Sequence, residues 1–410
     1  MATFGGLRGT GDFSADERPK NFREMIQWRN PSGSAPIFGL TSKAGKKTVN
    51  DPEFSWWDEP NDLIRLQSAQ SHAAGITQIV IDSLDPTAAT PSALYGSALN
   101  LKEGDLLMVE GADTAVWDGT VNEIIRVQSV QSSTTFTAAR GQSGTTAATI
   151  PNDAWLTLVG SAYAEGTSAP TATARNPIKY SNFTQIFKDT YELTGTADNT
   201  EFRTGDAWSN DKKRKMFKHS MDIEMAMIFG RAAETVGANG KPLRYMGGLR
   251  DYIPNYVFPG AATTDTFIDA LSSVFDFDTG AGDTRIGFFG RTALMELNKI
   301  IVASTNVKME LGNTLKVYGR NFRELVMPDG RLLISSHPLL SRHGLYKKSA
   351  LILDFSAIKY VALKNRDTKV KDDVQSKDED VRRGYIQTEC SLGVDGGGLS
   401  MKYIGNISAT

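Results

Sequence analysis

The residues with the chemistry for catalysis or metal binding are four histidines, one cysteine and a serine between two of the histidines. His337 and His343 flank Ser341, and a nucleophilic hydrolase needs such a serine and histidine in contact. No G-x-S-x-G turn presents this serine, and no histidine has further ligands at the spacing of a zinc site. His72 and His219 are isolated in the sequence. The pattern predicts structural histidines and no enzyme, with no catalytic residue, metal or cofactor.

Two charged segments are candidates for binding a partner. Residues 212–215 are four cations at the start of a predicted helix, where the helix dipole disfavours positive charge. They are either a solvated helix end beside Asp206 and Asp211, or a contact with a neighbouring subunit's acids or with phosphates, without sequence readout. Residues 371–383 mix both signs, which is typical of a solvated loop but also suits a symmetric contact. The candidate contacts here are Lys212, Lys213, Arg214, Lys215, Asp378, Glu379, Arg382 and Arg383.

The composition predicts a folded chain without strong overall charge. With 410 residues, 40% hydrophobic content and a net charge of −2, the chain can form two or three domains and has no general attraction to nucleic acid or anionic membranes. Cys390 is the single cysteine and cannot form an internal disulfide, which fits synthesis in a reducing cytoplasm. No apolar run approaches the length of a membrane span, so we expect a soluble protein without a membrane partner.

One long helix is predicted at residues 208–236. Polar N-cap residues at 209–211 begin it, and Gly237, Gly240 and Pro242 follow its end. Gly230 within it indicates either close approach of another backbone or a tolerated glycine. The expected buried stripe consists of Phe217, Met221, Met225, Ile228 and Ala232, widened by Met216, Ile223 and Met227.

The rest of the chain divides into segments of different texture. Residues 1–50 are rich in glycine and proline but carry many aromatics, which predicts an extended arm that lies along another surface. A basic flexible turn at 43–47 leads into a β ribbon whose returning strand is expected within 180–193. Short strands separated by turn residues at 75–168 predict an all-β module. Residues 246–349 predict a compact α/β unit, and a charged loop at 364–383 joins the last strands.

The order of these segments resembles the major capsid proteins of tailed phages, and more narrowly the SU10-like group with an HK97-type fold. The resemblance covers most of the chain apart from the β module. Its motifs are Arg29-Asn30-Pro31, Pro36-Ile37-Phe38, Asn50, Phe54-Ser55-Trp56, Asp58, and the run from Tyr191 to Ala197 before the long helix.

The resemblance implies an α+β, HK97-like capsid fold with an inserted all-β domain. A spine helix would occupy residues 210–236. The implied domains are an N-terminal arm at 1–42, the first part of an extended two-stranded E-loop at 43–74, the inserted all-β domain at 75–168, the E-loop return at 169–200, a peripheral domain with the spine helix at 201–245, an axial domain at 246–349, and peripheral strands with the charged loop at 350–410.

The implied function is structural. Copies would form hexamers and pentamers of an icosahedral shell around non-specifically packaged double-stranded DNA, in the virion capsid after assembly in the bacterial cytoplasm. A portal, a separate scaffolding protein and a decoration protein are further expected partners. A lysine-to-asparagine cross-link would involve Lys46 or Lys47, but no matching asparagine is found. The arm and E-loop residues expected at subunit contacts are Phe22, Trp28, Phe38, Lys46, Lys47, Trp56 and Trp57.

Two alternatives remain at the level of sequence. In a carbohydrate-binding or adhesin-like protein, Trp117 and Trp155 of the β module would stack on sugars. In an unrecognised hydrolase, Ser341 would act with His337 or His343. A shell visible by electron microscopy would favour the capsid interpretation over both.

Overall fold

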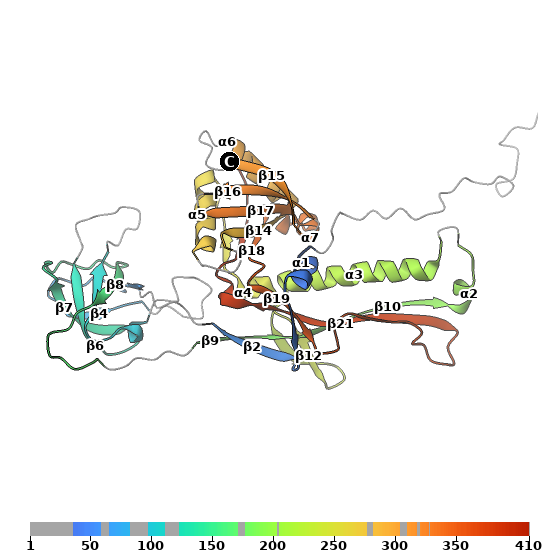
Figure 1. The fold of residues 1–410 in the computed structure, drawn as a ribbon, viewed down its shortest axis with the longest axis horizontal. Helices are drawn as coiled ribbons and strands as arrows, with labels where there is room; N and C mark the ends of the chain where they lie inside the picture. The colour runs from blue at the N-terminus through green and yellow to red at the C-terminus, as the bar shows by residue number, and fades with distance from the viewer. Residues whose placement is uncertain are drawn as a thin grey trace, which may run out of the picture.

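The structure, a computed structural model, describes residues 36–58, 65–82, 97–110, 123–170, 177–202, 205–276, 282–303, 310–317, 320–327 and 329–409. The candidate contacts Phe22 and Trp28 lie outside these ranges. The described elements form an elongated α+β molecule (Figure 1). A six-stranded sheet lies at one end, a seven-stranded sheet lies in the middle, and a five-stranded sheet with the long helix extends to the other end.

The long helix, α3 (Ala207–Phe229), begins where the Asp206 carboxyl accepts hydrogen bonds from the amides of Trp208 and Ser209. It ends at Gly230, so the predicted continuation to Val236 is wrong. A methyl group at Gly230 would clash with the carbonyl oxygens of Met246 and Ala226, which confirms close approach of another backbone. The chain then turns into a hairpin of β11 (Ala233–Val236) and β12 (Pro242–Tyr245).

The buried face of α3 differs from the predicted apolar stripe. Phe217, Met221 and Met225 are only half-buried, and Met216 is 45% exposed. The periodicity misplaced the face because two polar side chains are buried with the apolar ones. The buried residues of α3 are Trp208, His219, Ile223, Glu224, Met227 and Ile228.

α3 packs on the five-stranded sheet, mainly on its edge strand β10. The strand order is β1 (Lys46–Val49), β19 (Ile358–Leu363), β21 (Val381–Val394) and β10 (Gln185–Thr194), with β20 (Lys369–Lys371) also paired to β21. Lys46 and Lys47 therefore lie in a strand parallel to β19, and the expected flexible turn is wrong. The segment read as one returning ribbon strand is two strands, of which β10 pairs with β21.

The β ribbon consists of β2 (Glu53–Asp58) and β9 (Ile178–Phe183), paired over their full length. Before it, residues 36–44 form the helix α1 (Pro36–Ala44), so the extended conformation expected there is wrong. α1 packs against α3 and β19, and this tertiary contact stabilises a helix too short to be stable alone.

The seven-stranded sheet takes strands from both sides of the expected domain boundary. β18 (Ala350–Leu353) and β22 (Lys402–Gly405) were expected with the peripheral strands, but they pair with each other, and on their other sides β18 pairs with β14 (Thr284–Phe289) and β22 with β13 (Asn255–Val257). The helices α5 (Thr264–Phe275) and α6 (Arg291–Ala303) pack into one hydrophobic cluster with this sheet. The strand order is β13 (Asn255–Val257), β22 (Lys402–Gly405), β18 (Ala350–Leu353), β14 (Thr284–Phe289), β17 (Gly330–Ser336), β16 (Arg320–Met327) and β15 (Glu310–Val317).

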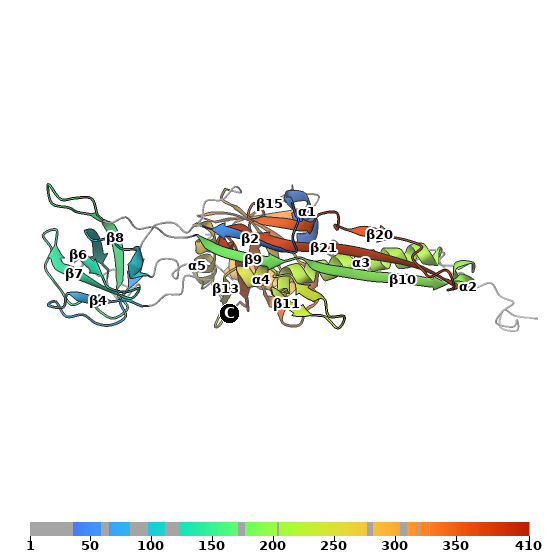
Figure 2. The ribbon, with the colours of Figure 1, turned by 90° about the horizontal axis from the view of Figure 1, so that it is seen from below.

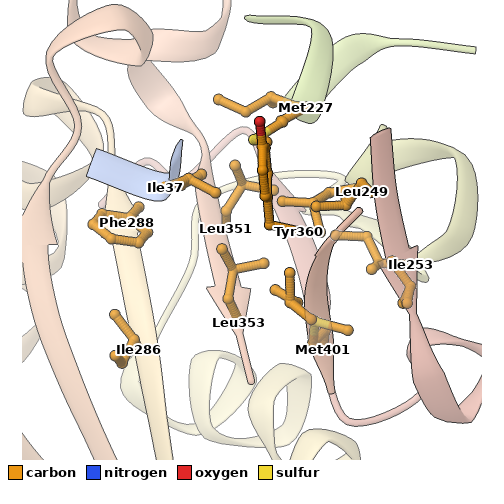
Figure 3. Close-up of a cluster of buried hydrophobic side chains, with 14 of the residues drawn as sticks. Ile37, Met227, Leu249, Ile253, Ile286, Phe288, Leu351, Leu353, Tyr360 and Met401 are labelled. Carbon is orange, nitrogen blue, oxygen red and sulfur yellow. The ribbon is translucent and has the colours of Figure 1, made fainter. Parts of the chain in front are cut away.

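A single hydrophobic core joins the middle sheet to the helices and the five-stranded sheet (Figure 3). It contains side chains from α1, α3, α4 (Leu249–Tyr252), β14, β18 and β19. The two sheets and the N-terminal helix are therefore one packed body. The labelled core residues are Ile37, Met227, Leu249, Ile253, Ile286, Phe288, Leu351, Leu353, Tyr360 and Met401.

The six-stranded sheet forms a separate all-β module with its own core (Figure 2). The short strands expected in this region are present, and the sheet also includes β3, which begins at Arg65 rather than after Gly75. All its neighbouring strands are antiparallel. The order is β3 (Arg65–Gln67), β8 (Trp155–Ser161), β5 (Asp105–Val109), β6 (Ile124–Val130), β7 (Thr135–Gln142) and β4 (Gln78–Val80).

Within the described ranges, no helix is both long and apolar enough to cross a membrane. Over the same residues, no group of three or more His, Cys, Asp and Glu side chains has the geometry to hold a metal ion.

Candidate functional site

A buried carboxyl group, that of Glu224 on α3, connects three parts of the chain. Its Oε1 accepts hydrogen bonds from Ile37 N (2.9 Å) and His337 Nε2 (2.7 Å), and its Oε2 accepts one from Phe38 N (2.6 Å). The side chains of Glu224 and His337 are both 0% exposed. Ile37 and Phe38 lie in the first turn of α1, where the amides have no partner within the helix. Glu224 therefore caps α1 and attaches it to the spine.

His337 belongs to this buried site and not to a catalytic pair. Its Nδ1 accepts a hydrogen bond from Leu340 N (3.3 Å), which leaves Nε2 to donate to Glu224. The Ser341 hydroxyl donates to the carbonyl oxygen of His337 (2.6 Å) and accepts from Arg291 N (3.0 Å). The hydroxyl and the imidazole thus cap α7 (Pro338–Arg342) and the start of α6, and the serine–histidine contact of the hydrolase hypothesis is not formed.

A second buried histidine connects α3 to the five-stranded sheet. His219 Nδ1 lies 2.8 Å from Asp189 Oδ2, and its Nε2 lies 2.8 Å from Thr388 Oγ1. The order of groups is that of a catalytic triad, but the Thr388 side chain is completely buried and out of reach of a substrate. His72 and His343 also bond to nearby backbone groups. All four histidines therefore have structural partners.

The basic segment at the start of α3 is partly paired within the chain. Lys212 Nζ lies 2.7 Å from Asp372 Oδ2, and Arg214 has a weaker contact of 3.6 Å with an acid three residues earlier. Lys213 is exposed and Lys215 is half-buried, and neither forms an ion pair with another described residue. The part of this segment that remains open for a partner is centred on Lys213 and Arg214.

Arg382 lies at the tip of the molecule, where α3 starts and β10 ends. Its guanidinium is 4.4 Å from the ring centre of Trp208, which packs edge-on against Tyr191. The guanidinium also lies 3.4 Å from Asp198 and 3.3 Å from Asp373. This predicted subunit contact thus holds the tip of its own chain together, and half of its side chain or more is covered.

The neighbouring charged residues remain closer to solvent. Arg383 Nε lies 2.7 Å from Glu192, and its Nη1 lies 3.4 Å from Glu379. Asp378 is exposed. The ion pairs among these side chains are exposed and screened by solvent, so a partner subunit can rearrange them at little cost.

The aromatic candidates fall into two groups. Phe38 packs edge-on against Tyr360, with ring centres 5.8 Å apart, and Trp56 packs against Tyr252 at 5.6 Å. Both are half-buried in the chain's own core. Trp57, the next residue on β2, is 60% exposed, because alternate residues of a strand face opposite sides. Trp57 is therefore the ribbon aromatic that is available to a second molecule.

The two ribbon-proximal lysines also differ in their surroundings. Lys46 pairs with Asp367, whose carboxyl in turn accepts a hydrogen bond from the Tyr360 hydroxyl. Lys47 is exposed. Burial alone would raise the pKa of Asp367, but the hydrogen bonds from Lys46 and Tyr360 outweigh it and hold this pKa below its usual range.

Glu224 and Asp189 were not predicted from the sequence as anchoring residues. Each looks like a surface acid, and its partners lie far away in the chain, at a separation of 187 residues for Glu224 and Ile37. In the β module, Arg65 covers the ring of Trp155 at 4.6 Å, so the expected sugar-stacking face is occupied by a guanidinium. Trp117, its expected companion, lies outside the described residues.

Comparison with known proteins gives one consistent match. The model of the SU10 major capsid protein family matches residues 9–397. The major capsid protein of Pseudomonas phage PaMx41 is 27% identical over 416 residues, which covers 98% of this chain and 92% of that protein. The capsid of an empty GTA particle is 11% identical with a TM-score of 0.48, over 96% of this chain and 97% of that one. The capsid of cyanophage A-1(L) is 9% identical with a TM-score of 0.46, over 96% and 98%.

Proposed function

Because the chain belongs to the SU10 major capsid protein family, we propose that its copies form hexamers and pentamers that tile an icosahedral shell around double-stranded DNA. It is a phage major capsid protein, a component of the virion capsid. The family match over residues 9–397 is the observation that carries this proposal. The family expected from the order of the segments is thereby confirmed, and the α+β, HK97-like fold class with it.

The shape of the subunit supports contacts over a long distance. The β module and the α2–β10–β21 tip lie at opposite ends of the molecule (Figures 1 and 2), where α2 is Gly195–Asp198. The ribbon carries an exposed tryptophan, and the tip carries surface ion pairs. Both are suited to weak contacts with neighbouring copies, and many such contacts together hold a closed lattice strongly. We assign Trp57, Lys47, Asp378 and Arg383 to contacts with neighbouring copies.

The exposed cations at the start of α3 and the β module are the surfaces that we assign to further partners. Lys213 and Arg214 offer exposed positive charge for the phosphates of packaged DNA or for the acids of a neighbour. A portal, a separate scaffolding protein and assembly in the host cytoplasm follow from the role as a shell protein. The β module, held away from the body at the end of the ribbon, is suited to projecting from the shell or to receiving a decoration protein.

Negative-stain electron microscopy of the purified protein tests the proposal, and shells or capsomer rings are the expected result. Deletion of residues 1–35 tests the arm, because this deletion leaves α1 and its cap by Glu224 in place. We expect folded subunits that no longer close shells. Full assembly of this truncated chain would contradict the role of the arm, and absence of any assembly by the intact chain, both alone and together with the other structural proteins of the phage, would contradict the function.

Replacement of Lys213 and Arg214 by glutamine tests the basic segment, with Lys212→Gln as the matched control because Lys212 already pairs with Asp372. Reduced DNA retention in the first variant at unchanged folding is expected. Equal packaging by both variants would leave the segment as a solvated helix end.

A further inference from the structure

Helix α5 presents an acidic face to solvent. Asp265, Asp269, Ser272 and Asp276 follow one another at intervals of four, three and four residues, so they lie on one side of the helix and just beyond its end. The three aspartates are exposed, and α5 contains no lysine or arginine. The opposite side of α5, with Phe267, is buried in the core of the middle sheet. We call these four residues the α5 face.

Lys402 on β22 is a cation close to the end of this face, and its ammonium group is bound to other groups. Burial lowers the pKa of Lys402, and the attraction of Asp276 opposes this effect; the Lys402 Nζ donates to Ser273 Oγ (2.9 Å) and lies 5.4 Å from the ring centre of Tyr256. Lys402 is also partly buried. It therefore acts on the end of the row at Asp276, whereas Asp269 is exposed and forms no ion pair with another described residue.

The domain of the seven-stranded sheet also carries a basic face, which lies at the start of α6 next to α7. Arg291 begins α6, Arg342 ends α7, and Lys347 lies in the short helix η3 (Tyr346–Lys348). All three are exposed, and none has a carboxylate within ion-pair distance among the described residues. Leu345, between them in the chain, is 73% exposed. We call these four residues the α7–η3 face.

Helix α6 separates the two faces. Its first residue is bound to α7, since Arg291 N donates to Ser341 Oγ, while the carbonyl oxygen of Ile300 near its end accepts from Thr264 Oγ1 of α5 (3.3 Å). These contacts are nine residues apart along α6, or roughly 14 Å at the helical rise. Figure 1 shows α5 and α7 on opposite sides of the middle domain. One domain thus has an acidic side and a basic side.

We propose that the α5 face of one copy binds the α7–η3 face of the next copy, so that the middle domains join head to tail around a ring. This inference rests on the proposed function, and it specifies which surfaces meet. A contact of either face with itself places like charges together, whereas an acidic-to-basic contact is heterologous, and repeated heterologous contacts close a ring when the rotation from copy to copy fits. A nucleic acid fits the basic face alone and does not account for the exposed Asp269 on the acidic face.

Charge reversal provides the test in the full-length protein. One variant carries Asp269→Lys with Asp276→Lys, and the other carries Arg342→Glu with Lys347→Glu. All four positions are exposed, and melting temperatures check that each variant folds. We expect the critical concentration for assembly to rise about ten-fold or more in each variant, because like charges then meet at the interface. The charge-matched control, Glu103→Lys with Glu165→Lys in the β module, should assemble normally.

Two combinations make the test specific. A chain with all four reversals has exchanged its acidic and basic sides and should assemble as the intact chain does. An equimolar mixture of the two variants should assemble through alternation, since each can bind the other on both sides. Alternation closes a ring of six but not a ring of five, so the mixture should form hexamers without closed shells.

Each result decides the inference separately from the proposed function. If the intact chain forms shells but both variants also do so at the same concentration, the head-to-tail contact is wrong and the capsid function stands. Failure of the four-reversal chain, although it is folded, would likewise overturn the contact. Loss of DNA retention by the Arg342→Glu variant without any loss by the Asp269→Lys variant would assign the basic face to nucleic acid instead.

Discussion

Replacement of Glu224 by glutamine should detach α1 from the body of the subunit. The carboxyl accepts three buried hydrogen bonds, from Ile37 N, Phe38 N and His337 Nε2. Glutamine keeps one oxygen and places an NH₂ group where the other was, so at least one buried donor faces another donor. Each unsatisfied buried group costs about 1–3 kcal/mol. We therefore expect a loss on the order of 3 kcal/mol in the free energy of unfolding.

Chemical denaturation of unassembled protein, together with amide hydrogen exchange of residues 36–44, measures this loss. The matched control is Asp222→Asn on the same helix, whose side chain is 45% exposed and pairs with Lys218. An exposed pair contributes about 0–1 kcal/mol, so the control should change little. If Glu224→Gln loses less than about 1 kcal/mol and α1 stays protected from exchange, the carboxyl is not the anchor and the reasoning is refuted.

Three further predictions test other parts of the structure. Glu123→Gln breaks a buried pair with Arg140 and should destabilise the β module by about 3–5 kcal/mol, visible as faster hydrogen exchange there. Gly230→Ala should lower the free energy of unfolding by about 1–3 kcal/mol through its clash with neighbouring carbonyl groups, seen as a lower melting temperature, whereas Gly344→Ala meets open space and should leave it unchanged. Acid should loosen the tip, because the hydrogen bonds from Lys212 and then Tyr191 hold the pKa of Asp372 below its usual range. Because the pKa of Asp372 is lower in the folded than in the unfolded protein, its ionised carboxylate stabilises the fold at any pH above the unfolded pKa of about 4. This stabilisation is lost as the pH falls through the lower, folded-state pKa. Amide hydrogen exchange at the tip measures this loss. Backbone amides of the tip that stay equally protected from exchange below a pH of about 4 would count against this prediction.

Local features of the fold were predictable because their causes are local. The short apolar strands of the β module are separated by turn residues, a pattern that is present in the sequence itself. The close approach at Gly230 was one of two readings that a glycine within a helix allows. Such features depend on residues a few positions apart, so single-sequence reasoning reaches them.

Strand partners were not predictable in the same way. β18 and β19 are both almost completely buried and follow one another after a four-residue turn, yet they enter different sheets. An apolar strand buried on both faces carries no signal of which neighbour it pairs with. The domain boundary predicted at residue 350 therefore divided strands that belong together.

The anchoring groups were hidden for a related reason. Glu224 and His337 are 113 residues apart in the chain, and both are polar residues that usually lie at the surface. Only the fold reveals that they share one buried hydrogen bond. The face of α3 was misplaced because these polar partners decide which side of the helix is covered.

The pairing at the outer end of the β ribbon has a consequence for protein engineering. Asp58 and Ile178 are direct partners in the antiparallel ladder, and the β module lies between them in sequence. Strands that are paired in this way can be joined by a turn of two to five residues. The module can thus be exchanged for a short hairpin, or for a foreign domain whose ends lie close together, without changing the register of the ribbon. The same position is a natural attachment point for displaying an antigen or an enzyme in many copies.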